Sequence, residues 1–370
     1  MSYVDHGLPP GCRSFEFTDR RTRPGQGASD QAESVDLEAT RIGKGSAPLD
    51  RHTAGVDLNY VTTHFFGDKN FQAEAFFVWN SNPTPSVDTS LGDLTARGFR
   101  FDFPNDVWQA HLSYREFGND YDPAVGFVTR NGFRRVEPRV AWRPLSDSSW
   151  IRRYSMSAQY RRLADLTTGQ VEEEQWDLNL FGFDFEAGDN WDIIARRQDE
   201  FLDRAFEISD GVVIQPGQYA NWEWTLRGGT ASRRRLSANF NFTNGGFWSG
   251  DRSQVSLGLT FRPNPGISFS TDIQRNDVNL PEGNFTVDLT RFEAAWDINP
   301  GASVSGNIQY DTPTEIIGLF ARARWIVKPG NDLFLVYTNN WRNLGGSVFD
   351  RNLETLSRGG SVKVNYTYRL

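Results

Sequence analysis

The strongest constraint on the fold is an alternation of apolar and polar residues that recurs in many separate segments of the chain. Between positions 254 and 262, for example, Val255, Leu257, Leu259 and Phe261 alternate with polar or small residues. Successive side chains of a β-strand point to opposite faces, so a period of two predicts strands with one apolar and one polar face. The segments run to about 9–12 residues, which suits strands that cross a membrane at a tilt and exceeds the about 5–6 residues of most globular strands.

The composition separates a membrane barrel from a helical membrane protein. Hydrophobic residues make up 38% of the chain, and no stretch approaches the roughly 20 consecutive apolar residues of a transmembrane helix. A transmembrane barrel needs an apolar residue only at every second position, because the other face of each strand points into the interior. A soluble β-sandwich also has alternating strands and is the open alternative.

Aromatic residues favour the barrel over the sandwich. They make up 14% of the chain, and several lie at the ends of the alternating segments, where barrels carry aromatic girdles at the two membrane interfaces. The residues that we place in these girdles are Trp79, Trp142, Trp191, Trp325, Trp341 and Tyr368.

The connections between the segments are alternately short and long. Tight turns rich in Gly, Pro, Asp and Asn alternate with longer polar connections such as 117–133, 200–218, 245–252 and 276–283. Outer-membrane barrels have this arrangement, with short periplasmic turns and longer extracellular loops. We therefore predict an all-β transmembrane antiparallel barrel of about eighteen strands, an even number as in single-chain bacterial barrels. The predicted strands are 34–42, 54–65, 70–80, 95–103, 107–116, 134–143, 150–163, 172–186, 191–199, 219–228, 233–244, 253–262, 267–275, 284–297, 302–310, 314–327, 332–342 and 359–370.

Two of these segments have features of their own. In 284–297 the apolar phase slips between Leu289 and Phe292, which predicts a β-bulge. The segment 359–370 alternates up to the end of the chain. We expect it to be the last strand, recognised by the barrel-assembly machinery and paired with the first strand to close the barrel, because an open edge in lipid leaves backbone groups unpaired.

The barrel is assigned to residues 34–370 and an irregular segment to residues 1–33. Residues 1–30 are polar and rich in Gly and Pro, without the apolar core of a secretory signal peptide. An outer-membrane protein needs such a signal, so we expect that the native N-terminus is truncated. A cytoplasmic chain is the alternative.

No group of residues predicts catalysis or a cofactor. Cys12 is the single cysteine, and the four histidines lack any metal-binding spacing, so we expect neither an enzyme nor a cofactor or metal site. The acidic run 172–177 has two interpretations, a cation site or a charged loop edge, of which the second is favoured. The net charge of -8 argues against nucleic acid as a partner.

The polar faces of the predicted strands supply the candidate functional residues. If the apolar faces contact lipid, the polar faces line the interior of the barrel. The residues that we place on this lining are His111, Arg115, Glu223, Arg227, Asn239, Asp272, Gln309, Arg322 and Arg324.

Arginines also gather at 152–153, 161–162 and 233–235. One interpretation is that lining arginines attract anionic solutes or lipopolysaccharide phosphates. The other is that they pair with lining carboxylates such as Glu223 and Asp272. The second is favoured because 47 acidic residues outnumber 39 basic ones.

Several segments resemble a bacterial family of outer-membrane proteins. The matching stretches are YDPAVGFVTRNGFRR at 121–135, FEISDGVVIQPGQY at 206–219, NFTNGGFWSGDR at 241–252, VNLPEGNFTVDLTRF at 278–292 and IQYDTPTEIIGLFARARWIVKPGNDLFLVY at 308–337. In that family an N-terminal carbohydrate-binding module (family-nine-like) is fused to a C-terminal β-barrel domain of unknown function. The chain resembles the barrel part only, and the module and signal peptide are absent from it.

The resemblance implies a location in the bacterial outer membrane, with outer-membrane lipid and lipopolysaccharide as neighbours and polysaccharide or oligosaccharide as a partner. Together with the polar lining, it predicts a channel or transport-type barrel for polar solutes, with glycan-derived solutes as one class. The alternative function is a membrane anchor or scaffold for a missing N-terminal carbohydrate-binding or enzymatic module.

Overall fold

The structure, a computed structural model, describes residues 13–18, 32–42, 51–123, 128–345 and 352–367, the first two ranges by their backbone alone. Almost every element is a strand; one 3-10 turn, η1, spans Gly92–Leu94. Within the described ranges, no helix is long and apolar enough to span a membrane. The strands are β1 (Arg13–Thr18), β2 (Ala32–Ile42), β3 (Arg51–Phe65), β4 (Lys69–Asn80), β5 (Thr95–Pro104), β6 (Trp108–Phe117), β7 (Phe133–Trp142), β8 (Ile151–Asp165), β9 (Val171–Phe185), β10 (Asn190–Leu202), β11 (Phe206–Ser209), β12 (Val212–Ile214), β13 (Gly217–Gly229), β14 (Leu236–Phe247), β15 (Gly250–Phe261), β16 (Ile267–Leu280), β17 (Gly283–Asn299), β18 (Ala302–Asp311), β19 (Ile316–Lys328), β20 (Asn331–Asn343) and β21 (Leu353–Asn365).

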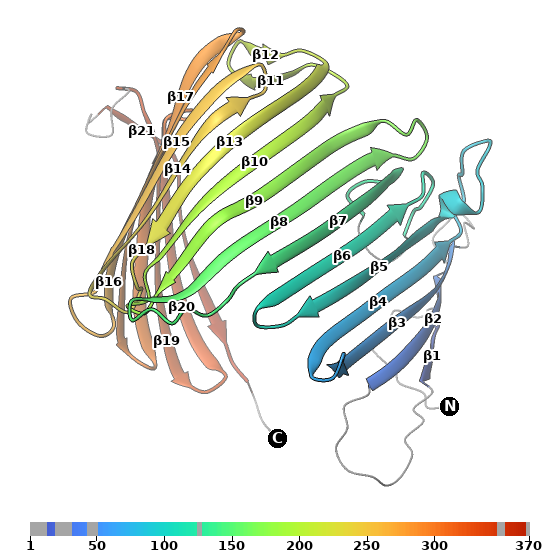
Figure 1. The fold of residues 1–370 in the computed structure, drawn as a ribbon. Coiled ribbons are helices and arrows are strands. Elements are labelled where there is room, and N and C mark those ends of the chain that lie inside the picture. The colour runs from blue at the N-terminus through green and yellow to red at the C-terminus, as the bar shows by residue number, and fades with distance from the viewer. Residues whose placement is uncertain (1–12, 19–31, 43–50, 124–127, 346–351, 368–370) are drawn as a thin grey trace.

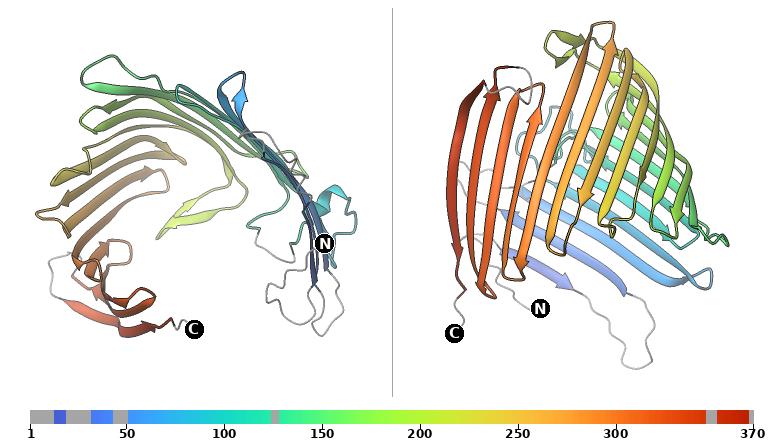
Figure 2. Two further views of the ribbon diagram at one scale, coloured as in Figure 1. Left: turned by 90° about the horizontal axis from the view of Figure 1, so that it is seen from below. Right: turned by 90° about the vertical axis from the view of Figure 1, so that its left-hand side faces the viewer.

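Nineteen of these strands form one antiparallel sheet, in which each strand pairs with its neighbours along the chain and β10 pairs with β13. The sheet curves strongly, so that it forms most of the wall of a barrel (Figures 1 and 2). Its two edge strands are β1 and β21, and no pairing between them is found in the part of the chain that the structure describes. The remaining strands, β11 and β12, form a separate hairpin.

The eighteen predicted strands coincide with β2–β10 and β13–β21 of the observed sheet, which confirms the all-β antiparallel fold. Strand β1 lies in the segment 1–33 that we expected to be irregular, so that expectation is wrong for residues 13–18. The alternation there covers only six residues, too few for a period to be recognised.

The two faces of the sheet differ in polarity and in exposure. On β15 the side chains of Val255, Leu257, Leu259 and Phe261 are between 37% and 51% exposed, while the residues between them are buried or half-buried. Side chains crowd together on the concave face of a curved sheet and spread apart on the convex face. The polar face is therefore the concave one, called the inner face below, and the apolar face is the convex outer face.

This pattern is the reverse of that in a soluble protein. A β-sandwich buries its apolar face against a second sheet, but here the apolar residues of strand after strand are exposed on the outer face. Exposed tryptophans lie near both ends of this apolar belt. At the end of the sheet that carries the short turns they include the predicted Trp142, Trp191 and Trp325. Toward the end that carries the long connections they are Trp176, Trp222 and Trp224. The predicted Trp79 and Trp341 are half-buried, and Tyr368 lies outside the described residues.

Several predicted boundaries differ from the structure. The connections expected at 245–252 and 276–283 are two-residue turns, at 248–249 and 281–282, because β14 to β17 continue beyond the apolar belt. The last strand spans Leu353–Asn365, so it begins six residues before the predicted 359; positions 368–370 of the prediction lie outside the described residues. The backbone amide of Thr367 instead donates to the side chain of Asn331, the first residue of β20.

The long connection between β4 and β5 is held to the connection between β6 and β7 by the carboxylate of Asp120. Asp120 accepts hydrogen bonds from the Ser86 hydroxyl (2.8 Å) and backbone amide (3.2 Å), and also from the Thr89 hydroxyl. Hydrogen bonds from Thr89 and then Ser86 lower the pKa of Asp120 below its ordinary value of 3.8. A carboxyl whose folded-state pKa is lowered stabilises its contacts above its ordinary pKa, and the stabilisation is lost as the pH falls through the lowered value.

We therefore expect Asp120→Asn to release this connection at neutral pH. Hydrogen exchange of the Ser86 and Thr89 amides, normalised for intrinsic rates, should be several-fold faster in the variant at pH 7. The difference should shrink and then vanish as the pH falls through the lowered pKa of Asp120, because the wild-type carboxyl is then itself protonated. Equal protection of the two proteins at pH 7 would show that Asp120 does not hold the connection.

Candidate functional site

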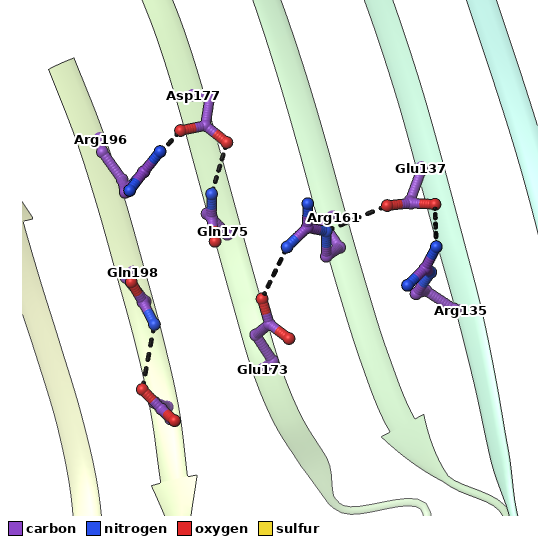
Figure 3. A network of polar contacts seen from close by, with 9 residues as sticks. Arg135, Glu137, Arg161, Glu173, Gln175, Asp177, Arg196 and Gln198 are labelled. Atoms are coloured by element: carbon purple, nitrogen blue, oxygen red, sulfur yellow. Dashed lines mark hydrogen bonds and ion pairs between the residues drawn. The ribbon is translucent and has the colours of Figure 1, made fainter. Parts of the chain in front are cut away.

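A network of charged side chains crosses the inner face from β7 to β10 (Figure 3). The guanidinium of Arg161 donates to Glu137 (3.0 Å) on one side and to Glu173 (3.1 Å) on the other. Arg135 reaches the second oxygen of Glu137 at 2.8 Å, and Arg196 donates to Asp177 at 2.7 Å. The register sets Arg196 level with Asp177 on the neighbouring strand. Glu173 lies two positions from Gln175, the residue level with Arg161, and Arg135 and Glu137 are two positions apart on β7, so these pairs are diagonal or within one strand.

Further ion pairs continue the network along the wall. Arg227 donates to Asp192 at 3.0 Å, and Arg252 pairs with Glu223. Arg227 is exposed, so its pair with Asp192 contributes on the order of 0–1 kcal/mol to stability. Glu223 is buried, and its pair with Arg252 satisfies a carboxylate that would otherwise lack a partner. The main effect of these pairs is to fix the positions of long side chains, which gives the inner face a defined surface.

The register places all nine predicted lining residues on the inner face, spread over β6, β13, β14, β16, β18 and β19. Asn239 and Asp272 are level with Gly258 of β15, His111 is bound to Asp102 (2.7 Å), and Arg324 lies 3.4 Å from Asp332. Arg115 and Arg322 are exposed and have no ion pair within the described residues. The nine residues do not converge on one point, so their role as the lining of a passage stays a prediction.

The arginine clusters pair with acidic groups, but largely with other partners than those expected. Glu223 pairs with Arg252, and no ion pair of Asp272 is found within the described residues. In the short turns, Arg233 donates to the Ala187 carbonyl (2.8 Å) and Arg234 to Asp189 (2.9 Å). These arginines stabilise turns and do not form a basic lining.

The acidic run between 172 and 177 does not form a single site. Its carboxylates alternate between the two faces of β9, as residues of a strand must. Glu172 pairs with Arg130, Glu173 with Arg161 and Asp177 with Arg196. Across the described ranges, no group of three or more His, Cys, Asp or Glu side chains could hold a metal ion.

The connection 203–216 folds into the β11–β12 hairpin, which covers the inner face near the long-connection end of β16. The hairpin residues Val212 and Ile214 are buried against Val278 and Leu280, with relative exposures of 6% or less. The hairpin thus explains why the inner face is apolar here. The signal for it is present in the sequence, because Asp210-Gly211 is a common hairpin turn and lies between two apolar stretches.

The same contact explains the slip of the apolar phase in β17, for which we predicted a bulge between Leu289 and Phe292. The β16–β17 register is continuous through this region, so the bulge is absent. Phe285 is an odd number of positions from the outer-face residue Phe292, so it lies on the inner face, where it packs against the hairpin cluster. The apolar residues change face because the inner face is covered here, and the strand itself is regular.

Beside the hairpin lies a cavity of about 300 Å³ in the inner face. Its lining is Arg196, Gln198, Glu200, Tyr219, Asn221, Glu223, Gly246, Phe247, Trp248 and Arg252. A second cavity, of about 290 Å³, lies between β18 and β20 and includes Gln309 and Phe320. Of the first cavity only Glu223 was predicted. Phe247, Trp248 and Arg252 were assigned to a polar connection, since the strands were expected to end before them.

No protein-family model matches the chain, and no curated protein is significantly similar to it in sequence. Among solved structures, a mutant of the ferric enterobactin receptor of Pseudomonas aeruginosa is similar with a TM-score of 0.52 and 11% identity, over 94% of this chain and 68% of that one. The ferric-catecholate import receptor of E. coli K12 has a TM-score of 0.47 and 8% identity, over 95% of this chain and 71% of that one.

At 11% identity the similarity to the first receptor concerns the fold alone. It agrees with the curvature and antiparallel order of the sheet, and the chain therefore has the fold of an outer-membrane β-barrel. The comparisons give no support to the fusion with a carbohydrate-binding module that the sequence resemblance implies.

Proposed function

We propose that the chain is a barrel of the bacterial outer membrane that carries polar solutes along its inner face. The observation that supports this most is the inverted distribution of polarity, with an exposed apolar belt outside and a network of paired charges inside. An apolar outer face that extends over most of the strands is stable in contact with lipid and unfavourable in contact with water. A polar inner face is stable when it is hydrated. Outer-membrane lipid and lipopolysaccharide are the proposed neighbours of the outer face.

The proposed solutes are polar molecules, with glycan-derived compounds as one class. A wall in which most charges are paired favours no strong selection by ionic charge. The alternative, a membrane anchor for a carbohydrate-binding or enzymatic module, needs the same outer face but no open path along the inner one. The two functions therefore differ in conductance.

A planar-bilayer measurement tests the proposal. The full chain, refolded in detergent and inserted into a bilayer, is expected to give steady conductance. Arg322→Glu, which reverses an unpaired charge on the inner face, should shift the ion selectivity toward cations by a measurable change of reversal potential.

The control is Arg97→Glu, near the end of the outer face. It breaks the ion pair of Arg97 with Glu116 but changes no charge on the inner face, so it should leave selectivity unchanged. Heat-modifiable migration on gels confirms that each variant is folded. A folded, inserted protein that stays silent would support the anchor and contradict transport.

A further inference from the structure

The cavity beside the hairpin is built around Trp248. The Trp248 ring contacts Phe206 of the hairpin (centroids 5.2 Å apart) and Tyr219 of β13 (5.3 Å), in edge-to-face geometry. The Asn221 side chain donates to the Trp248 carbonyl at 3.1 Å. Trp248 also has a φ of 49°, a conformation that bulky residues rarely adopt and that the surrounding contacts must maintain.

Around these rings the cavity presents planar polar groups. Gln198 and Asn221 carry amides, and Arg196 and Arg252 carry guanidinium groups that face carboxylates. The charges in the lining cancel, since two arginines are matched by Glu200 and Glu223. Arg252 is already paired with Glu223, and Arg196 with Asp177. The cavity therefore offers hydrogen bonds in many directions without an excess of positive charge.

From this geometry we infer that the cavity binds one or two rings of a neutral sugar. A pyranose has an apolar C–H face that packs on an aromatic ring and a rim of hydroxyls that both donate and accept hydrogen bonds, as amides, guanidinium groups and carboxylates require. A volume of about 300 Å³ lies at the lower end of small-molecule sites, which span about 300–1,000 Å³. A ferric catecholate complex is an anion and would need an excess of positive charge that this lining lacks.

The inference deepens the proposed function, because the cavity lies on the inner face along which solutes would pass. Its test is a calorimetric titration of the detergent-solubilised full chain with maltose and with cellobiose, which needs no open channel. At least one disaccharide should bind saturably, and more tightly than ferric enterobactin. Trp248→Ala should weaken the binding at least about tenfold, as loss of an aromatic anchor does.

Two further variants keep the test independent of folding. Gln198→Ala removes one amide and no aromatic packing, and should weaken binding a few-fold. Phe320→Ala removes an aromatic ring from the second cavity and should leave the affinity unchanged. Far-UV circular dichroism and heat-modifiable migration must be the same for all variants.

The outcomes separate this inference from the proposed function. A conducting barrel that binds neither disaccharide, or whose affinity survives both Trp248→Ala and Gln198→Ala, overturns the sugar site and leaves transport intact. Tighter binding of the ferric complex than of either disaccharide also overturns it. Saturable binding by a silent barrel supports the sugar site and contradicts transport.

Discussion

Leu257→Arg is expected to destabilise the membrane-inserted protein by about 2–4 kcal/mol, whereas Ser256→Arg should cost little. Leu257 is 41% exposed on the outer face, in the middle part of β15, while Ser256 lies on the inner face. The first arginine would enter the hydrocarbon of the bilayer, and the second would extend into a hydrated interior. Equilibrium urea unfolding in lipid vesicles measures the difference.

A depth series provides the control. Phe261, the last residue of β15, lies on the same face at the end of the short turns. Phe261→Arg should cost only about 0–1 kcal/mol from membrane insertion, since arginine reaches the interface there. Equal penalties at positions 256 and 257 would contradict the assignment of the two faces, and equal penalties at 257 and 261 would contradict the depth of β15.

The sheet could be predicted from the sequence because its determinant is local. The alternation on β15 assigns Leu257 and Ser256 to opposite faces whatever the neighbouring strands are, and the neighbours then follow from short connections along the chain. Strand ends were less predictable on the long-connection side. There β14 to β17 extend beyond the apolar belt. The outer face of these strand ends does not need apolar residues, so the alternation stops before the strand does.

The candidate site was less predictable because its determinants are not local. The apolar residues Val278 and Phe285 violate the polar pattern of the inner face, and only the hairpin that covers them explains this. Trp248 gives no signal of its own, since an aromatic residue in a connection has many structural roles. It becomes a candidate through contacts with Phe206 and Tyr219, which lie 42 and 29 positions away. By contrast, the Asp210-Gly211 turn was a readable local signal for the hairpin.

Truncation after Gly360 is expected to abolish stable insertion into membranes. β21 pairs with β20 along its whole length, from Asn343↔Leu353 to Asp332↔Asn365. Without residues 361–370, the β20 backbone from Asp332 to Val336 would lose its partner. Unpaired N–H and C=O groups in hydrocarbon cost roughly several kcal/mol each. The truncation removes these pairs and also the strand that we expect to close the barrel against the first strand, so the truncated sheet should be unstable in lipid. Protease protection in liposomes and heat-modifiable migration on gels measure the loss.

The matched control removes a similar number of residues without exposing a strand edge. Leu202 and Gly217 are direct partners at the ends of β10 and β13, so a two-residue Gly-Gly turn can replace residues 203–216. This variant loses the hairpin but keeps every strand of the large sheet, and it should insert normally. If the truncated chain inserts as well as the control does, β20 must find another partner for its edge, and residues 361–370 are then dispensable for assembly. If both proteins fail, the hairpin is needed for folding, and the cost of an open edge must be measured with single proline substitutions along β21 that remove one backbone donor at a time.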